Sequence, residues 1–168
     1  MIERNNLVHL TENSIDIPTV LFRNSSFAFE QNCFCWYARN HHELVGIGPR
    51  LTEVLLNDYC FCKPDGMFFE ETRDGWILKK FLEVKSGSLH KMTKKVFGFK
   101  SIIDLWRESP NTLITSFTQK FESADLETPD FISIPNDENI EVVFASHKIY
   151  KPSSPPEGIH FRLTFLQY

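Results

Sequence analysis

The chain has 168 residues, 42% of them hydrophobic, and carries a formal net charge of −4 at pH 7. This length suits a single domain over residues 1–168 with a hydrophobic core, and the composition excludes a disordered or repetitive chain. No segment has the ~18 apolar residues needed to cross a bilayer, and the first residues lack the apolar block of a signal peptide. We therefore expect an intracellular protein, cytoplasmic or nuclear, with no membrane partner.

The first part of the chain is rich in apolar, branched and aromatic residues, which favour strands. We expect strands over 15–23 and 26–39, with Asn24-Ser25 as the turn between them. Residues 1–47 would then form a strand-rich N-terminal extension in front of a core over 49–150.

Four cysteines form two Cys-Phe-Cys units, Cys33/Cys35 and Cys60/Cys62. Paired cysteines can hold zinc or an iron–sulfur cluster, but zinc sites usually place about two to four residues between them, and here there is one. Residues i and i+2 share a face of a strand, and a buried reduced cysteine packs as a small hydrophobe. Core thiols are the preferred interpretation, with metal binding as the alternative.

The segment 63–87 predicts a β-hairpin that brings two carboxylates together. Two runs of aromatic and branched residues flank an Asp-Gly pair at Asp74, which is a strong hairpin signal. A hairpin centred on Asp74 pairs Asp65 with Glu83, and a slip of one residue pairs Asp65 with Val84. Opposed side chains have Cβ atoms about 4.5–5.5 Å apart, so either register lets both carboxylates reach one ion.

This arrangement suits Mg²⁺ or Mn²⁺ chemistry on a phosphodiester. Period two along a strand directs Glu83 and Lys85 to the same face. We expect Asp65, Glu83 and the backbone carbonyl of Val84 to hold the ion, and Lys85 to orient the attacking water or the scissile phosphate. The structural alternative is that Asp65 is a turn residue after Pro64, with Glu83 and Lys85 as an exposed charged pair.

The pattern Pro64-Asp65 followed by Glu83-Val84-Lys85 resembles the PD-(D/E)xK nuclease superfamily, over about residues 49–107. The resemblance implies an α/β (or α+β) fold, with a central mixed β-sheet flanked by helices in a restriction-endonuclease-like core. Within the superfamily, the pattern is similar to lambda-exonuclease-like alkaline nucleases. Those enzymes usually continue Lys-Cys-Pro, whereas Lys85 is followed here by Ser86-Gly87.

The resemblance also implies a further acidic metal ligand on a helix before the Asp strand. A helix is expected to begin at Pro49, because proline suits the first turn and an apolar stripe follows it. Glu53 occupies the matching place and is a candidate ligand, with Glu43 as the alternative.

Seven lysines and one acid lie within 79–100, so this stretch carries +6 against −10 for the rest of the chain. A basic stretch beside the site is typical of phosphate contact, although such a run can also be a solvated helix face. A helix starting at Ser88 would bury the stripe Met92, Val96, Phe99, Ile103 and Trp106 and leave its lysines off that stripe. The expected nucleic-acid contacts are Ser86, Lys91, Lys94 and Lys95.

The C-terminal third predicts one more helix and two strands. After the break at Ser109-Pro110-Asn111 we expect a helix over 112–121, followed by an acidic surface connection over 122–138. The strand candidates 140–150 and 158–168 would pair as a hairpin across a Pro-rich loop.

The sequence thus predicts a metal-dependent deoxyribonuclease, with endo- and exonuclease action both open. The alternatives are an RNA endonuclease of the same fold and a non-catalytic nucleic-acid-binding or assembly subunit. The expected partners are nucleic acid, DNA before RNA, and a further copy of the chain in a homo-oligomer.

Overall fold

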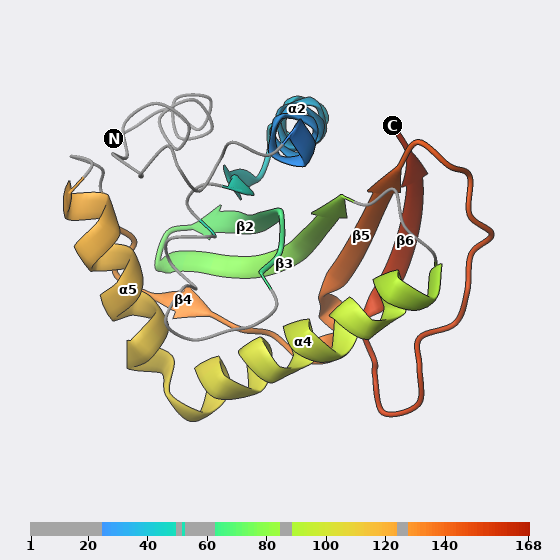
Figure 1. Cartoon of the computed structure of the whole chain (residues 1–168). Helices are drawn as coiled ribbons and strands as arrows, with labels where there is room; N and C mark the ends of the chain where they lie inside the picture. The colour runs from blue at the N-terminus through green and yellow to red at the C-terminus, as the bar shows by residue number, and fades with distance from the viewer. Residues whose placement is uncertain (1–24, 50–51, 53–62, 85–88, 124–127) are drawn as a thin grey trace.

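A computed structural model describes residues 25–49, 52, 63–84, 89–123 and 128–168. Its elements follow in chain order, and Figure 1 shows their arrangement. They are α2 (Ser25–Asn40), β1 (Val45–Ile47), β2 (Gly66–Thr72), β3 (Gly75–Val84), α4 (Leu89–Glu108), α5 (Pro110–Ser123), β4 (Ile132–Ser133), the 3₁₀ turn η2 (Asp137–Asn139), β5 (Glu141–Ser146) and β6 (Arg162–Gln167).

The strands form one mixed sheet of order β1-β2-β3-β5-β6, with β4 also paired to β3. The pairs β1–β2 and β2–β3 are antiparallel, whereas β4 and β5 both run parallel to β3, and β6 runs parallel to β5. The protein is therefore an α+β fold with a central mixed sheet, as the sequence predicts.

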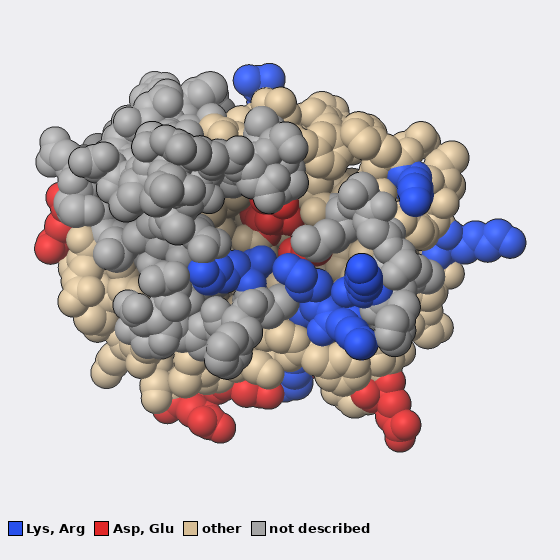
Figure 2. Space-filling view, viewed as in Figure 1, with Lys and Arg blue, Asp and Glu red and all other residues tan. Residues whose placement is uncertain are grey.

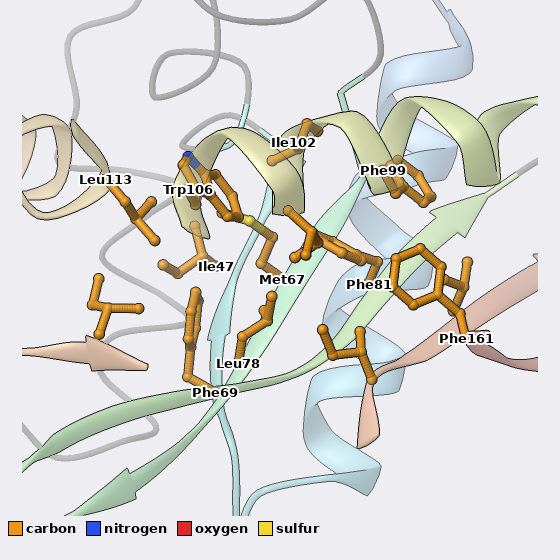
Figure 3. Close-up of a cluster of buried hydrophobic side chains, with 14 of the residues drawn as sticks. Ile47, Met67, Phe69, Leu78, Phe81, Phe99, Ile102, Trp106, Leu113 and Phe161 are labelled. Carbon is orange, nitrogen blue, oxygen red and sulfur yellow. The ribbon is translucent and has the colours of Figure 1, made fainter. Parts of the chain in front are cut away.

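Helices cover both faces of the sheet. On one face, α4 and α5 bury a large apolar core against it, and Figure 3 shows Trp106 of α4 next to Met67 of the sheet; Phe99 of α4 stacks on Phe81. On the other face, α2 packs a smaller core against alternate residues of the same strands. The α2 core comprises Cys33, Phe34, Tyr37, Ala38, Leu44, Phe68, Leu82, Val84, Val143 and Ala145.

The expected helices after the hairpin are confirmed. All five residues of the predicted α4 stripe are at most 1% exposed. Pro110 opens α5, where a proline has no backbone N–H to leave unpaired. At the earlier predicted helix, Thr52 donates its backbone N–H to the Gly48 carbonyl at 3.1 Å, which is a helical turn. Of the described helices, none is long and apolar enough to span a membrane.

Two sequence-based expectations are wrong. The segment 26–39 is helical, because its buried residues Cys33, Phe34, Tyr37 and Ala38 recur at the period of a helix turn and not of a strand. The last two strands, β5 and β6, pair in parallel and not as a hairpin. Their long connection returns along the sheet, and it is held there by the buried side chains of Ile159 and Phe161.

Candidate functional site

The open end of the β2–β3 hairpin carries the two carboxylates. The pairs Met67↔Phe81 and Gly66↔Leu82 follow the predicted register, and Asp65 lies one residue beyond the last of them, where its N–H donates to the Leu82 carbonyl at 2.8 Å. The predicted register is confirmed as far as Gly66, and the register shifted by one residue is wrong for these pairs; Asp65 itself lies beyond the paired residues.

At the turn end of the hairpin, the observed pairs are offset by one residue from the predicted pairs. Thr72 pairs with Gly75, so the turn is a two-residue loop and is not centred on Asp74. A β-bulge between Phe68 and Phe69 leaves Lys79 as an extra residue on β3, which restores the predicted register towards the open end. The one-residue offset of the turn and the extra residue at the bulge cancel, so the predicted pairing holds from Phe68 to Gly66.

Each carboxylate has a defined partner. Asp65 is half-buried, and its Oδ2 accepts the Val84 backbone N–H at 2.7 Å. Glu83 is fully buried, and its Oε1 lies 3.0 Å from Nζ of Lys95, which reaches it from α4. A buried ionised carboxylate is costly without a compensating charge, so Lys95 stabilises the ionised form of Glu83. This contact places Lys95 inside the site, in addition to its predicted position at the nucleic-acid surface.

The electrostatics of the site favour an added cation. The pKa of Asp65 is raised well above its ordinary value by burial and by the negative charges of Glu83 and Glu30, against the opposing effects of the Val84 N–H and Lys95. Like charges held close together in a poorly solvated place disfavour ionisation, and a divalent cation relieves that repulsion.

Glu30 is the acidic residue that the sequence interpretation missed. It lies on α2, and its charge acts on Asp65 from the opposite side of the strand end to α4. The helical period of residues 33–38 was the available signal, because it places Glu30 one turn before Cys33 and Phe34. Glu43, the earlier alternative, instead lies 3.4 Å from His41 Nδ1 in the exposed turn after α2.

Some predicted residues lie outside the described part of the chain, namely Glu53, Lys85, Ser86, Cys60 and Cys62. Their predicted roles stay predictions. Of the cysteines that are described, Cys33 is fully buried in the α2 core. Burial and the nearby charge of Asp65 raise the pKa of the Cys33 thiol to about 12, so it stays protonated as a core thiol.

The basic stretch is largely neutralised by ion pairs. Four of its six described lysines pair with acids: Lys79 with Glu70, Lys80 with Glu141, Lys95 with Glu83, and Lys100 with Asp104 and Asp137. Lys91 and Lys94, near the start of α4, are exposed. In Figure 2, acidic side chains are recessed near the middle of the face that carries α4, and a group of basic side chains lies beside them.

The donor set fits a hard divalent ion only in part. Two carboxylates and solvent are sufficient for Mg²⁺, which keeps several waters when bound. Within the described ranges no group of three or more His, Cys, Asp or Glu residues could hold a metal ion, so Glu30 influences the site by its charge and is not a third ligand in this arrangement.

No family model, no curated protein and no solved structure matches this chain.

Proposed function

We propose that this protein is a divalent-metal-dependent nuclease of the PD-(D/E)xK type that hydrolyses phosphodiester bonds, in DNA before RNA. The observation that carries the proposal is that Asp65 lies beside Glu83 at the open end of the hairpin, because it bonds to the backbone of both neighbours of Glu83, Leu82 and Val84. A mixed sheet with helices on both faces agrees with the restriction-endonuclease-like core that the resemblance implies.

The chain's own residues would bind and orient the reacting groups. Asp65 and Glu83 would hold Mg²⁺ or Mn²⁺, together with the predicted Val84 carbonyl. The Val84 N–H fixes one Asp65 oxygen, so the other oxygen is the one to face the ion. When bound, the ion polarises the phosphoryl group and lowers the pKa of a bound water.

Lys95 gives the site a second source of positive charge. Its ammonium lies against the Glu83 carboxylate on the side of α4, where Lys91, one turn earlier, and Lys94, the preceding residue, are exposed. Lysines beside a phosphate neutralise the charge that develops on its oxygens. Lys85 is proposed to orient the attacking water, and Ser86, Lys91 and Lys94 to contact the backbone of the nucleic acid.

Cleavage assays with variants that each lack one charged group test this proposal. Purified protein is incubated with single- and double-stranded DNA and RNA in Mn²⁺, in Mg²⁺ or in EDTA. We expect metal-dependent cleavage that falls by at least about 100-fold in Asp65→Asn and Glu83→Gln, which remove a charge and keep the side-chain shape, and in Lys85→Ala, which removes the ammonium together with its side chain.

Glu70→Gln is the matched control. Glu70 belongs to the same hairpin and also pairs with a lysine, but it is exposed near the turn, so this variant should cleave like the wild type. The nuclease proposal fails if the wild type and Lys85→Ala are equally inert on every substrate. Metal-independent binding of nucleic acid without cleavage would instead assign the fold to a non-catalytic subunit.

A further inference from the structure

Four aromatic side chains form a cluster between α2 and the ends of β5 and β6. The ring of Phe29 lies 4.4 Å from that of His147 and 5.4 Å from that of Tyr168, and the Trp36 ring lies 5.2 Å from the Tyr168 ring. His147 Nδ1 also lies 3.0 Å from the Tyr168 carbonyl oxygen, which fixes the end of β6 beside β5. We call Phe29, Trp36, His147 and Tyr168 the aromatic platform.

The platform is accessible to solvent although it is rich in rings. Trp36 is 37% exposed and His147 is exposed, whereas Phe29 and Tyr168 are half-buried against the α2 core. The other two tryptophans, Trp76 and Trp106, are buried in the core on the opposite face of the sheet. Trp36 is therefore the tryptophan that a ligand can reach from solvent.

The platform lies at the same edge of the sheet as the candidate site. Because β3, β5 and β6 are parallel, their carboxyl ends meet at one edge, where Figure 1 shows their arrowheads beside α2. Glu83 lies near the end of β3, and His147 and Tyr168 directly follow β5 and β6. Phe29 is the neighbour in sequence of Glu30, whose charge acts on Asp65.

Ring and charge chemistry at this edge fit one class of ligand. Exposed aromatic rings bind nucleobases by stacking when the bases are unpaired, while the bases of a duplex are already stacked on each other. Exposed cations occur near these elements: Lys148 directly follows His147, and Lys91 and Lys94 lie near the start of α4, the helix whose Lys95 contacts Glu83. These cations complement the phosphates of a strand whose bases contact the rings.

We propose that the aromatic platform binds unpaired bases next to the scissile phosphate, so that the substrate of the site is a single-stranded segment. The inference rests on the proposed nuclease function for the identity of the ligand. It also makes Trp36 a specificity-determining residue that takes no part in the chemistry.

Tryptophan fluorescence in EDTA tests the platform without requiring cleavage. The wild-type protein is titrated with a single-stranded oligonucleotide, of DNA or RNA, and with the same DNA sequence as a blunt duplex. We expect the single strand to quench Trp36 emission and the duplex to leave it unchanged. Trp36→Ala should weaken single-strand binding, measured by anisotropy of a labelled oligonucleotide, by about 5- to 100-fold and leave duplex binding unchanged.

Phe131→Ala is the matched control variant. Phe131 is an aromatic residue that is more exposed than Trp36, but its backbone pairs with Trp76 at the other end of β3, roughly 25 Å along the strand. Its loss should not change single-strand binding. Trp36→Phe should keep most of the affinity, because a smaller ring still stacks, while the fluorescence response disappears.

Equal quenching by single strand and duplex, no quenching by either, or full affinity in Trp36→Ala would overturn the platform proposal. In each of these cases metal-dependent cleavage by the wild type would still uphold the nuclease function. Conversely, selective quenching without cleavage in any metal would keep the platform as a single-strand binding site and reject the nuclease. A platform that only a protein partner can occupy would give no response to any oligonucleotide, which also overturns the proposal.

Discussion

A carboxylate–lysine pair lies near each of the two ends of the β2–β3 hairpin, and the two pairs differ in burial. Near the turn, Oε2 of Glu70 lies 3.2 Å from Nζ of Lys79, and the two side chains are 48% and 36% exposed, respectively. At the open end, Oε1 of Glu83 lies 3.0 Å from Nζ of Lys95; the Glu83 side chain is fully buried and that of Lys95 is 27% exposed. The distances are nearly equal, but the surroundings are not.

The difference separates a surface contact from a site. An exposed ion pair gains little, because water already solvates both charges and salt screens them. A buried carboxylate has lost that solvation, so its charge depends on the groups that the fold places beside it. The open end combines a buried acid, a second acid beside it and a lysine from α4, which is the combination that the proposed metal-dependent reaction would use.

Removing each lysine in turn gives the largest expected contrast. Lys95→Met should lower the free energy of unfolding by about 3 kcal/mol, because Glu83 keeps its burial and loses a neighbouring positive charge. Lys79→Met should change it by about 0.5 kcal/mol or less. Urea denaturation of the two variants and the wild type near neutral pH measures both values.

The same pair of variants also tests whether the open end accepts a cation. If a divalent ion binds there, Mg²⁺ or Mn²⁺ should stabilise Lys95→Met more than Lys79→Met, because ligand that binds only the folded state raises its stability. Equal free energies of unfolding for the two variants without metal would show that Lys95 does not stabilise Glu83 and that burial does not distinguish the two ion pairs.

The turn end should depend on backbone geometry where the open end depends on charge. Gly75 has φ of +140°, and a Cβ there would lie 2.2 Å from the Phe131 carbonyl oxygen, which accepts the Trp76 N–H. Gly75→Ala should therefore destabilise the protein by about 2–3 kcal/mol, as backbone strain and a steric clash act together.

Gly158→Ala is the control for this change. Gly158 also has a positive φ, +80°, but a Cβ there meets nothing within 4 Å. It should cost about 1 kcal/mol, which is the strain of the backbone alone. Thermal unfolding of both variants gives the comparison, and an equal loss in the two would show that the contact with Phe131 is not restrictive.

The part of the site that lies within one hairpin could be predicted from the sequence. An Asp-Gly turn and two runs of strand-forming residues predict a hairpin and its register to within one residue, which is enough to bring Asp65 near Glu83. The bulge at Lys79 was not visible, because it depends on how the whole strand pair twists and not on any residue's own preference. It happened to cancel the offset of the turn.

The part of the site that comes from distant elements could not be predicted. Aromatic and cysteine residues in α2 favour a strand on composition, and the helical spacing of the residues that pack against Phe68 and Leu82 was the weaker signal that decided the structure. With α2 taken as a strand, neither the position of Glu30 nor the pairing of Trp36 with Tyr168 could be derived. Parallel pairing of β5 and β6 was missed for a similar reason, since sequence neighbours pair as hairpins more easily than across a long return.

The smallest expected effect concerns the proton of Asp65. Its pKa is raised in the folded protein by burial and by Glu83 and Glu30, so the folded state keeps this proton to a higher pH than the unfolded chain. The unfolded chain therefore releases it first, and stability is lost as the pH rises from the ordinary aspartate pKa of 3.8 through the raised value. Asp65→Asn has no such proton, while its amide oxygen can still accept the Val84 N–H.

We accordingly expect Asp65→Asn to be more stable than the wild type at neutral pH, with the advantage shrinking as the pH falls towards 3.8. Urea midpoints of both proteins across the acidic to neutral range measure this difference. Glu70→Gln, measured over the same range, is the control for an exposed carboxylate near the turn. Saturating Mg²⁺ should reduce the advantage, because a cation would stabilise the ionised carboxylate that the asparagine lacks. An Asp65→Asn variant that is less stable than the wild type at neutral pH would mean that the charged carboxylate is already compensated in the folded protein, and the repulsion that supports a metal site would not exist.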